Sequence, residues 1–144
     1  MSDKHTETEA ARAEFKAQIA TVASYLQALE ARDIEAAGAC LAASVQITGP
    51  GGSKAASVEQ IVANSARRYH RIGKHITHFD AMGSGDGAVV VYCMGTLHGE
   101  WPDGRTFTGI RFIDRFELRD GLITNQQVWN DAAEHRLRET SHTS

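Results

Sequence analysis

Residues 109–131 read GIRFIDRFELRDGLITNQQVWND and contain two runs in which apolar and polar residues alternate. Successive side chains of a β-strand point to opposite faces, so alternation over 110–118 gives one apolar face. A second run, 122–129, follows Arg119-Asp120-Gly121, and an Asp-Gly pair between two such runs is typical of a tight hairpin turn. We therefore predict an antiparallel hairpin here.

Asp114 lies in the middle of the apolar face of the first run. The other residues of that face are Ile110, Phe112, Phe116 and Leu118. A carboxylate is rarely buried without a partner, because an unpaired buried charge is costly or is lost through a shifted pKa. We interpret Asp114 either as a reaction-site carboxyl or as a structural acid paired with Tyr25, a histidine or a backbone amide.

The length and charge of the chain indicate how many domains it has and which partners it could bind. It has 144 residues, with 15 Lys and Arg against 18 Asp and Glu. We predict one domain over 12–138, a flexible N-terminus over 1–11 and a flexible tail over 139–144. Because the charges nearly balance, no basic field would attract nucleic acid, so we expect no nucleic-acid partner.

The cysteines and the apolar runs indicate the compartment. Cys40 and Cys93 lie in apolar stretches without Cys-x-x-Cys spacing, and the polar N-terminus lacks the apolar segment of a signal peptide. We therefore predict a cytoplasmic protein with reduced thiols. The longest apolar run, 88–94, has the length of a strand rather than the roughly 20 residues that cross a bilayer, so no membrane partner is expected.

The first half of the chain has the spacing of helices. An apolar stripe predicts a first helix ending near residue 31, with Tyr25 about 80° from the centre of the stripe. Asp33 is a typical N-cap for a short helix over 34–41. The stripe of the first helix consists of Phe15, Ile19, Val22, Leu26 and Leu29.

Strands dominate the second half. A short strand over 45–47 and a Gly-Pro loop over 49–53 precede a third helix, which follows Ser57 and runs to about residue 71. We then predict strands over 75–82, 88–101, 105–118 and 122–129, and a C-terminal helix over 132–137. Helices followed by a meander of strands indicate an α+β fold.

Two stretches resemble the nuclear transport factor 2-like superfamily. Tyr25-Leu26-Gln27-Ala28-Leu29-Glu30-Ala31-Arg32-Asp33 resembles the end of its first helix, and 109–131 resembles its last hairpin, with the pattern D-G-x-I…W-x-D. The likeness covers roughly 12–135. It implies a cone-shaped, strongly curved antiparallel sheet wrapped around three N-terminal helices, and it implies a homodimer.

The ketosteroid isomerases of this superfamily suggest roles for two residues. They have a Tyr where Tyr25 stands and an Asp in a setting like Ile113-Asp114-Arg115-Phe116, and these two form an oxyanion hole in which the Asp stays protonated. Their general base would lie in the loop where this chain has Gly49. The resemblance therefore favours Asp114 and Tyr25 as catalytic residues, without the isomerase reaction as such.

Other branches suggest Asp131 and His75. SnoaL-like polyketide cyclases keep an Asp in a pattern like Trp129-Asn130-Asp131, and dehydrochlorinase-like members use a His resembling His75. Asp131 is also a good N-cap for the C-terminal helix. His75 and His78 fall on opposite faces of a regular strand, so at most one of them faces the interior, and the resemblance favours His75 as a base.

Strand alternation also predicts the lining of a substrate cavity. On a regular strand Asp131 shares its face with Trp129, Gln127 and Asn125, a face too polar for a plain core. The predicted substrate-binding residues are Trp129, Phe112, Gln127, Asn125 and Tyr92. The chain has no His, Asp or Glu spacing of a known metal site and no phosphate-binding loop, so we expect neither a metal nor another cofactor.

Together these observations predict a small cofactor-independent enzyme. It would carry out acid–base chemistry as a lyase, isomerase or cyclase on a mostly apolar molecule, such as a polyketide, terpenoid, steroid or aromatic compound. The alternative is a non-catalytic ligand-binding or dimerisation module whose interior is filled by its own side chains. In that case the face formed by Arg111, Ile113, Arg115 and Glu117 would pair two subunits.

Overall fold

A computed structural model describes residues 15–141, with side chains to residue 139. The helices are α2 (Lys16–Glu30), α3 (Ile34–Gly38), α4 (Val58–Arg68) and α5 (Ala132–Ser141), with a 3-10 turn η1 (Pro50–Gly52). The strands are β1 (Leu41–Thr48), β2 (Lys54–Ala55), β3 (Arg71–Gly83), β4 (Val89–Glu100), β5 (Thr106–Arg119) and β6 (Leu122–Asn130).

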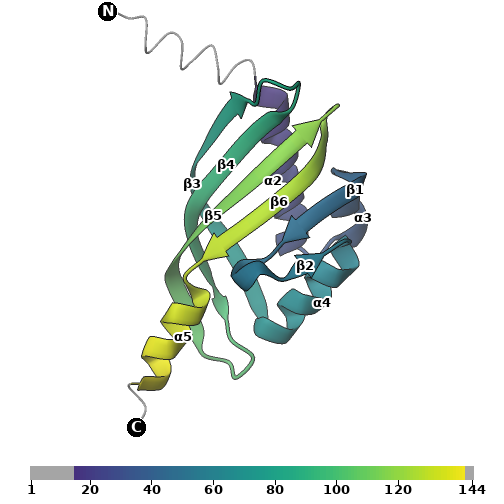
Figure 1. Cartoon of the computed structure of the whole chain (residues 1–144). Coiled ribbons are helices and arrows are strands. Elements are labelled where there is room, and N and C mark those ends of the chain that lie inside the picture. Colours follow the sequence, from purple (N-terminus) through teal and green to yellow (C-terminus); the bar gives the residue numbers. More distant parts are fainter. Residues whose placement is uncertain (1–14, 142–144) are drawn as a thin grey trace, which may run out of the picture.

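The strands form one curved sheet in the order β2-β1-β6-β5-β4-β3 (Figure 1). Neighbours are antiparallel except β1 and β6, which run parallel. Glycines permit the close strand approach on β4: a Cβ on Gly95 would lie 1.9 Å from the His75 carbonyl oxygen. Helix α2 lies behind the sheet in Figure 1, and its Tyr25 ring meets Phe116 of β5 edge to face, with centroids 6.0 Å apart.

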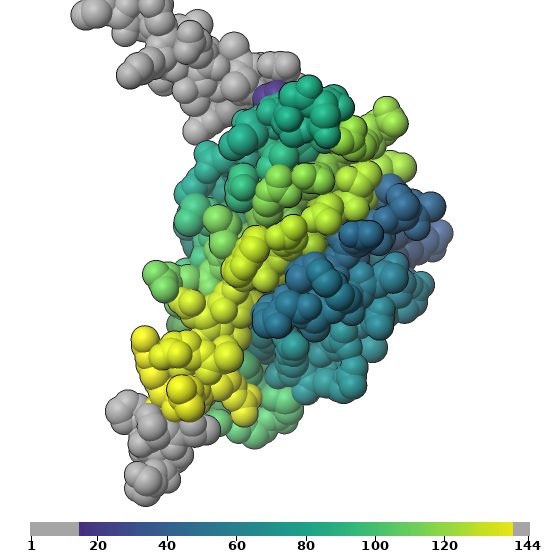
Figure 2. All heavy atoms as spheres, in the orientation of Figure 1, coloured from purple at the N-terminus to yellow at the C-terminus, as the bar shows by residue number. Residues whose placement is uncertain are grey.

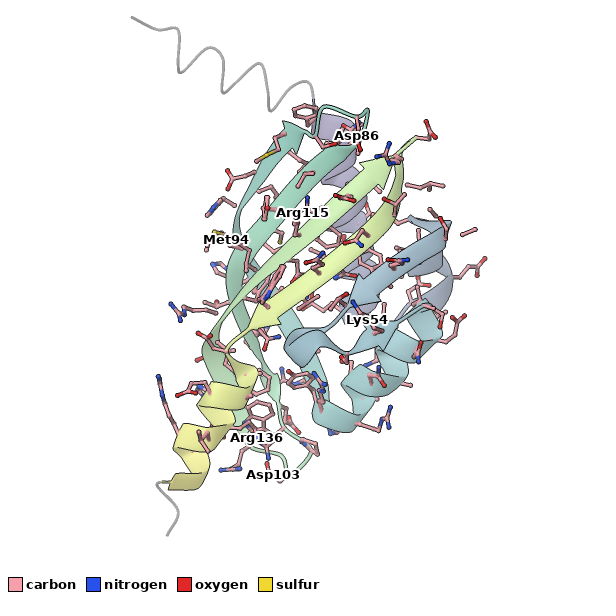
Figure 3. All side chains as sticks on the ribbon, in the orientation of Figure 1. Lys54, Asp86, Met94, Asp103, Arg115 and Arg136 are labelled. Carbon is pink, nitrogen blue, oxygen red and sulfur yellow. The ribbon has the colours of Figure 1, made fainter. Side chains whose placement is uncertain are left out.

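The sheet has an inner face toward α2 and an outer face away from it. The central inner residues of β5 are Ile110, Phe112, Asp114, Phe116 and Leu118, each at most 3% exposed. Across the ladder they pair with inner residues of β4 and β6, including Cys93 opposite Asp114 and Gln126 opposite Phe116. Arg115 and Met94, labelled in Figure 3, lie on the outer face.

Side-chain caps fix where two helices begin. The Asp33 carboxylate accepts a hydrogen bond from the Ala36 amide at 3.1 Å at the start of α3, and the Ser57 hydroxyl accepts one from the Gln60 amide at 3.2 Å at the start of α4. Both helices lie at the side of the molecule that carries β1 and β2 (Figure 1).

The predicted α+β cone over N-terminal helices is confirmed, with two changes in detail. The sheet is mixed rather than wholly antiparallel, because β1 joins it parallel to β6. Element ends also differ: the third helix ends at Arg68, and the strand predicted from residue 75 begins at Arg71. The C-terminal helix extends to Ser141, so 139–141 are helical, while 1–11 and 142–144 lie outside the described residues.

Candidate functional site

A cavity of about 170 Å³ opens between the inner face of the sheet, α2 and α4. Its wall is mostly apolar and includes Leu26, Leu29, Ile47, Ile61, Ile72 and Phe112. Gln126 and Lys74 bring polar atoms to this wall, and Arg32, Arg68 and Glu30 also line it. The combination of an apolar surface with a few polar groups is typical of small-molecule sites.

Asp114 and Lys74 form a buried acid–base pair at this cavity. The Asp114 side chain is fully buried, and Lys74, a quarter exposed, places Nζ 3.5 Å from Asp114 Oδ2 and 5.2 Å from the centre of the Phe112 ring. Both carboxylate oxygens lack a hydrogen bond of good geometry among the described residues. Lys74 lines the cavity, whereas Asp114 is not among the lining residues.

Burial controls the protonation of Asp114. Loss of solvent raises the pKa of its carboxyl above the ordinary range, while the positive charge of Lys74 and hydrogen-bond donors from Lys74 and Gln126 lower it by less. Cys93 is paired with Asp114 across the ladder, and burial raises the pKa of its thiol to about 12. The thiol therefore stays protonated and is a poor nucleophile at neutral pH.

Gln126 connects the cavity to Tyr25. The Tyr25 hydroxyl donates a hydrogen bond of 2.7 Å to Gln126 Oε1, which fixes the amide so that its NH₂ group is the end left for Asp114 and the cavity. Burial, followed by the nearby Asp114 charge, raises the pKa of Tyr25, so its hydroxyl remains a donor. Tyr25 itself is fully buried and does not line the cavity, whereas its hydrogen-bond partner Gln126 does.

The prediction that His75 faces the interior is wrong. A register shift between Ile76 and His78 introduces one extra residue into β3, and both histidines are exposed on the outer face. His78 Nε2 lies 3.4 Å from Asp80 there. In a regular strand His75 and His78 would lie on opposite faces. The extra residue between them places both on the same face.

Of the five residues predicted to line the cavity, Phe112 lies on its wall and the four others lie on the outer face of the sheet. Trp129, Gln127 and Asn125 oppose Ile113, Arg115 and Glu117, so they lie on the outer face, and the Trp129 residue is 51% exposed. The cause is a register shift between Glu117 and Leu118, which turns Gln126, Val128 and Asn130 inward. Tyr92 is also on the outer face, where its hydroxyl accepts a hydrogen bond from Arg115 at 3.2 Å.

The same register shift places Asp131 on the outer face. Its carboxylate accepts a hydrogen bond of 2.6 Å from Arg111 Nε on the outer surface, away from the cavity. Its carbonyl accepts the first helical hydrogen bond of α5 from His135. The side-chain bond to the start of α5 comes from Asn130, whose Oδ1 accepts from the Ala132 amide at 3.0 Å.

Sequence reasoning missed Lys74 and Gln126. Lys74 alternates with Ile72 and Ile76, so a strand begun at residue 71 would have placed a lysine on the apolar face. Gln126 has no comparable signal, because its inward orientation depends on the register shift in β6. Lys74 and Asp114 are both charged residues on the inner face of the sheet beside the cavity, a placement typical of functional sites.

Two further properties concern metals and membranes. Over residues 15–141, no three His, Cys, Asp or Glu side chains are grouped as they would be to hold a metal ion. In the same range, no helix combines the length and apolar character needed to span a bilayer.

The SnoaL-like domain model matches residues 22–126. The chain belongs to the SnoaL-like family. An NTF2-like protein of unknown function from Burkholderia pseudomallei is 21% identical, with a TM-score of 0.69 over 83% of this chain and 94% of that one. TerC, co-crystallised with polyporic acid, is 22% identical, with a TM-score of 0.69 over 85% and 98%.

A third solved structure points the same way. A putative polyketide cyclase from Xanthomonas campestris is 19% identical to this SnoaL-like chain, with a TM-score of 0.64 over 83% of this chain and 93% of that one. At these identities the likeness establishes the fold. Among curated proteins, none matches the chain. The expected membership of the nuclear transport factor 2-like superfamily, in its SnoaL-like branch, is confirmed.

Proposed function

We propose that this SnoaL-like protein is a cofactor-independent enzyme that moves protons on a small, mostly apolar carbonyl compound. The observation that supports this most is the Asp114–Lys74 pair, a fully buried carboxyl whose cationic partner lines an apolar cavity. A buried ion pair is weak evidence for stability, since apolar residues of similar volume often serve the core as well or better. A catalytic role accounts for its presence beside the cavity.

The chemistry follows from which atoms meet the ligand. Lys74 and the Gln126 amide are cavity-facing donors, placed to stabilise the negative oxygen of an enolate as it forms. When the Asp114 carboxylate takes a proton from the Lys74 ammonium, the amine becomes a base able to remove a carbon-bound proton. The raised pKa of Asp114 makes that internal transfer less costly. Tyr25 is a positioning residue that holds Gln126.

Proton exchange tests this proposal without knowledge of the natural substrate. The probe is 2-indanone, a compact ketone whose five-membered ring is fused to one benzene ring, and the readout is replacement of its α-protons by deuterium in D₂O, followed by ¹H NMR. We expect exchange above the buffer rate, with a loss of roughly 10²-fold in Lys74→Met, the effect typical of removing one oxyanion donor. The matched control is Arg111→Met, which removes a cation from the outer face.

Two outcomes would contradict the catalytic proposal. Wild-type exchange no faster than buffer is one, and an equal rate in Lys74→Met and wild type is the other. If Lys74→Met does not fold, the double variant Lys74→Met/Asp114→Asn leaves no unpaired charge and provides the same comparison.

The size of the cavity supports a second candidate, a non-catalytic binding module. About 170 Å³ is below the roughly 300–1,000 Å³ common for ligand sites, so a large polyketide or steroid would be held by one end only. Trp129 and Tyr92 face outward and do not fill the interior, so binding is compatible with the structure. Saturable binding of 2-indanone without exchange would favour this candidate.

We also propose that the outer face pairs two copies in a homodimer. Two exposed apolar side chains lie on this face, which is the face of the sheet seen in Figure 2: Trp129 and Met94, 51% and 38% exposed, both pair with Ile113 across the ladder. Sedimentation velocity should give a dimer for wild type and a monomer for Ile113→Asp at the centre of this face. A monomeric wild type at tens of micromolar would contradict the proposal. A cytoplasmic location likewise stays a prediction.

A further inference from the structure

Charged residues line the cavity at two levels. Lys74 and Gln126 are the inner polar groups, with Gln126 only 3% exposed. Arg32 and Arg68 also line the cavity but are exposed, so they mark its mouth. Glu30 is the opposing carboxylate among the lining residues. The lining thus carries cations at both levels, with apolar side chains between them.

One face of α4 runs from the apolar wall to this mouth. Ile61, Ser65 and Arg68 are spaced four and three residues apart, so they share a helix face, and all three line the cavity. Arg68 has no carboxylate within ion-pair distance in the described part of the chain. Its position in the last turn of α4 also suits the helix dipole, a role that Arg67 shares.

Arg32 differs from Arg68 because its guanidinium is already engaged. It donates hydrogen bonds to the carbonyl oxygens of Tyr69 and His70, at 3.2 and 3.1 Å, and so ties the end of α2 to the segment before β3. Its positive charge still contributes to the mouth. Of the two arginines at the mouth, Arg68 is therefore the one with no ion-pair or hydrogen-bond partner for its guanidinium among residues 15–139, and it can contact the charged group of a ligand.

The volume limits what lies between the two levels. A cavity of about 150 Å³ lined by apolar side chains is known to hold benzene, so about 170 Å³ admits roughly one ring or an equivalent chain. A charged substituent on such a ring would reach the mouth, because too little volume remains inside for it and its hydration shell.

We infer that the cavity selects small organic acids, with one apolar ring or short chain in the interior, a carbonyl or hydroxyl oxygen beside Lys74 and Gln126, and a carboxylate beside Arg68. This inference rests on the proposed function and specifies its substrate class. Arg68 is then a specificity-determining residue that contacts the carboxylate and takes no part in proton transfer.

Three matched probes test the charge preference. They share one hydroxylated ring and differ at the other end: 4-hydroxyphenylacetate is an anion, its methyl ester is neutral, and tyramine is a cation. Isothermal titration of the full chain at low salt should show the acid binding about five- to tenfold more tightly than the ester, and tyramine binding most weakly. Added salt should reduce the preference.

Two arginine variants show which residue causes the preference for the acid over the ester. Arg68→Gln should bring the acid and the ester within about twofold of each other. Arg67→Gln, in the same helical turn but outside the cavity lining, should leave the wild-type preference. Arg67 donates a hydrogen bond to Asn64, and glutamine keeps an N–H group for that contact. Thermal unfolding of both variants shows whether the fold is kept.

Several results would overturn the inference. Equal affinity of wild type for the acid and the ester would do so. Tightest binding of tyramine would also do so, because it would mean that Glu30 rather than Arg68 determines which charge the mouth accepts. Equal losses in the two arginine variants would indicate the general field rather than a contact, and no saturable binding of the acid would exclude the class. Because 2-indanone has no charge, loss of its exchange would remove the proposed catalysis while leaving an observed acid preference intact.

Discussion

Strand β5 contributes one residue to an acid–base pair on each face of the sheet, Arg111 on the outer face and Asp114 on the inner face, and the two pairs differ in almost every physical respect. On the outer face Arg111 and Asp131 meet at 2.6 Å with side chains 82% and 42% exposed. On the inner face Lys74 and Asp114 are 3.5 Å apart, and Asp114 is fully buried. The outer pair is closer in space but remains solvated.

The difference shows that distance is a poor guide to the role of a charge pair. Water screens the outer pair, so its loss leaves two groups that are simply hydrated. The inner carboxyl has lost its water and gained one cation at a long distance, which leaves its pKa raised. The core would be satisfied by an apolar residue here, so the inner pair is the one that calls for a functional explanation.

The largest expected difference between the faces is in stability. Lys74→Met removes the only ion-pair partner of Asp114 found among the described residues, and a buried charge without its partner should lower the free energy of unfolding by about 2–4 kcal/mol at neutral pH. Arg111→Met should give no measurable change. Urea unfolding of both variants measures the comparison.

The double variant sharpens this result. Adding Asp114→Asn to Lys74→Met removes the stranded charge and should recover much of the lost stability. Equal small losses from Lys74→Met and Arg111→Met would mean that the inner pair is as well solvated as the outer one.

A smaller difference is expected between two adjacent glutamines. Gln126→Leu leaves the buried Tyr25 hydroxyl without its acceptor, which should cost about 1–3 kcal/mol. Gln127→Leu, one residue along β6 on the outer face, should have little effect. Thermal and urea unfolding measure both changes, and a larger loss from Gln127→Leu would contradict the assigned faces.

The alternation of apolar and polar residues in the sequence predicts part of the inner face correctly. The burial of Asp114 and Phe112 follows from an unbroken two-residue period along β5, and Asp33 and Ser57 mark helix starts through local capping chemistry. Such features depend on neighbouring residues alone, so they are visible in the sequence.

Most of the errors arise where the period is broken. One extra residue in β3 placed both His75 and His78 on the outer face. A register shift between β5 and β6 placed Gln126, Val128 and Asn130 on the inner face instead of Trp129, Gln127 and Asn125. A bulge depends on pairing with another strand, so no local pattern marks it. Lys74 was missed because the start of β3 was placed at residue 75 rather than 71.

The pH dependence of stability gives the subtlest comparison. The unfolded chain releases the Asp114 proton at the ordinary pKa of about 4, whereas the folded protein keeps it to higher pH. Wild type should therefore lose stability relative to Asp114→Asn as pH rises from about 4 to the raised folded pKa, with a constant difference above it. Urea unfolding of both proteins across this range measures the difference, and a wild type that gains stability relative to Asp114→Asn with rising pH would indicate a lowered pKa.

The most direct test is titration of individual carboxyl groups by ¹³C NMR. Asp114 and Asp86 provide opposite cases, since hydrogen bonds from Ser84, Ala88 and Arg119 lower the pKa of the exposed Asp86 to about 2. The account predicts an Asp114 pKa above the ordinary aspartate range, raised further in Lys74→Met because the opposing positive charge is gone. An Asp114 carboxyl that titrates at or below the ordinary range, or that is unaffected by Lys74→Met, would contradict it.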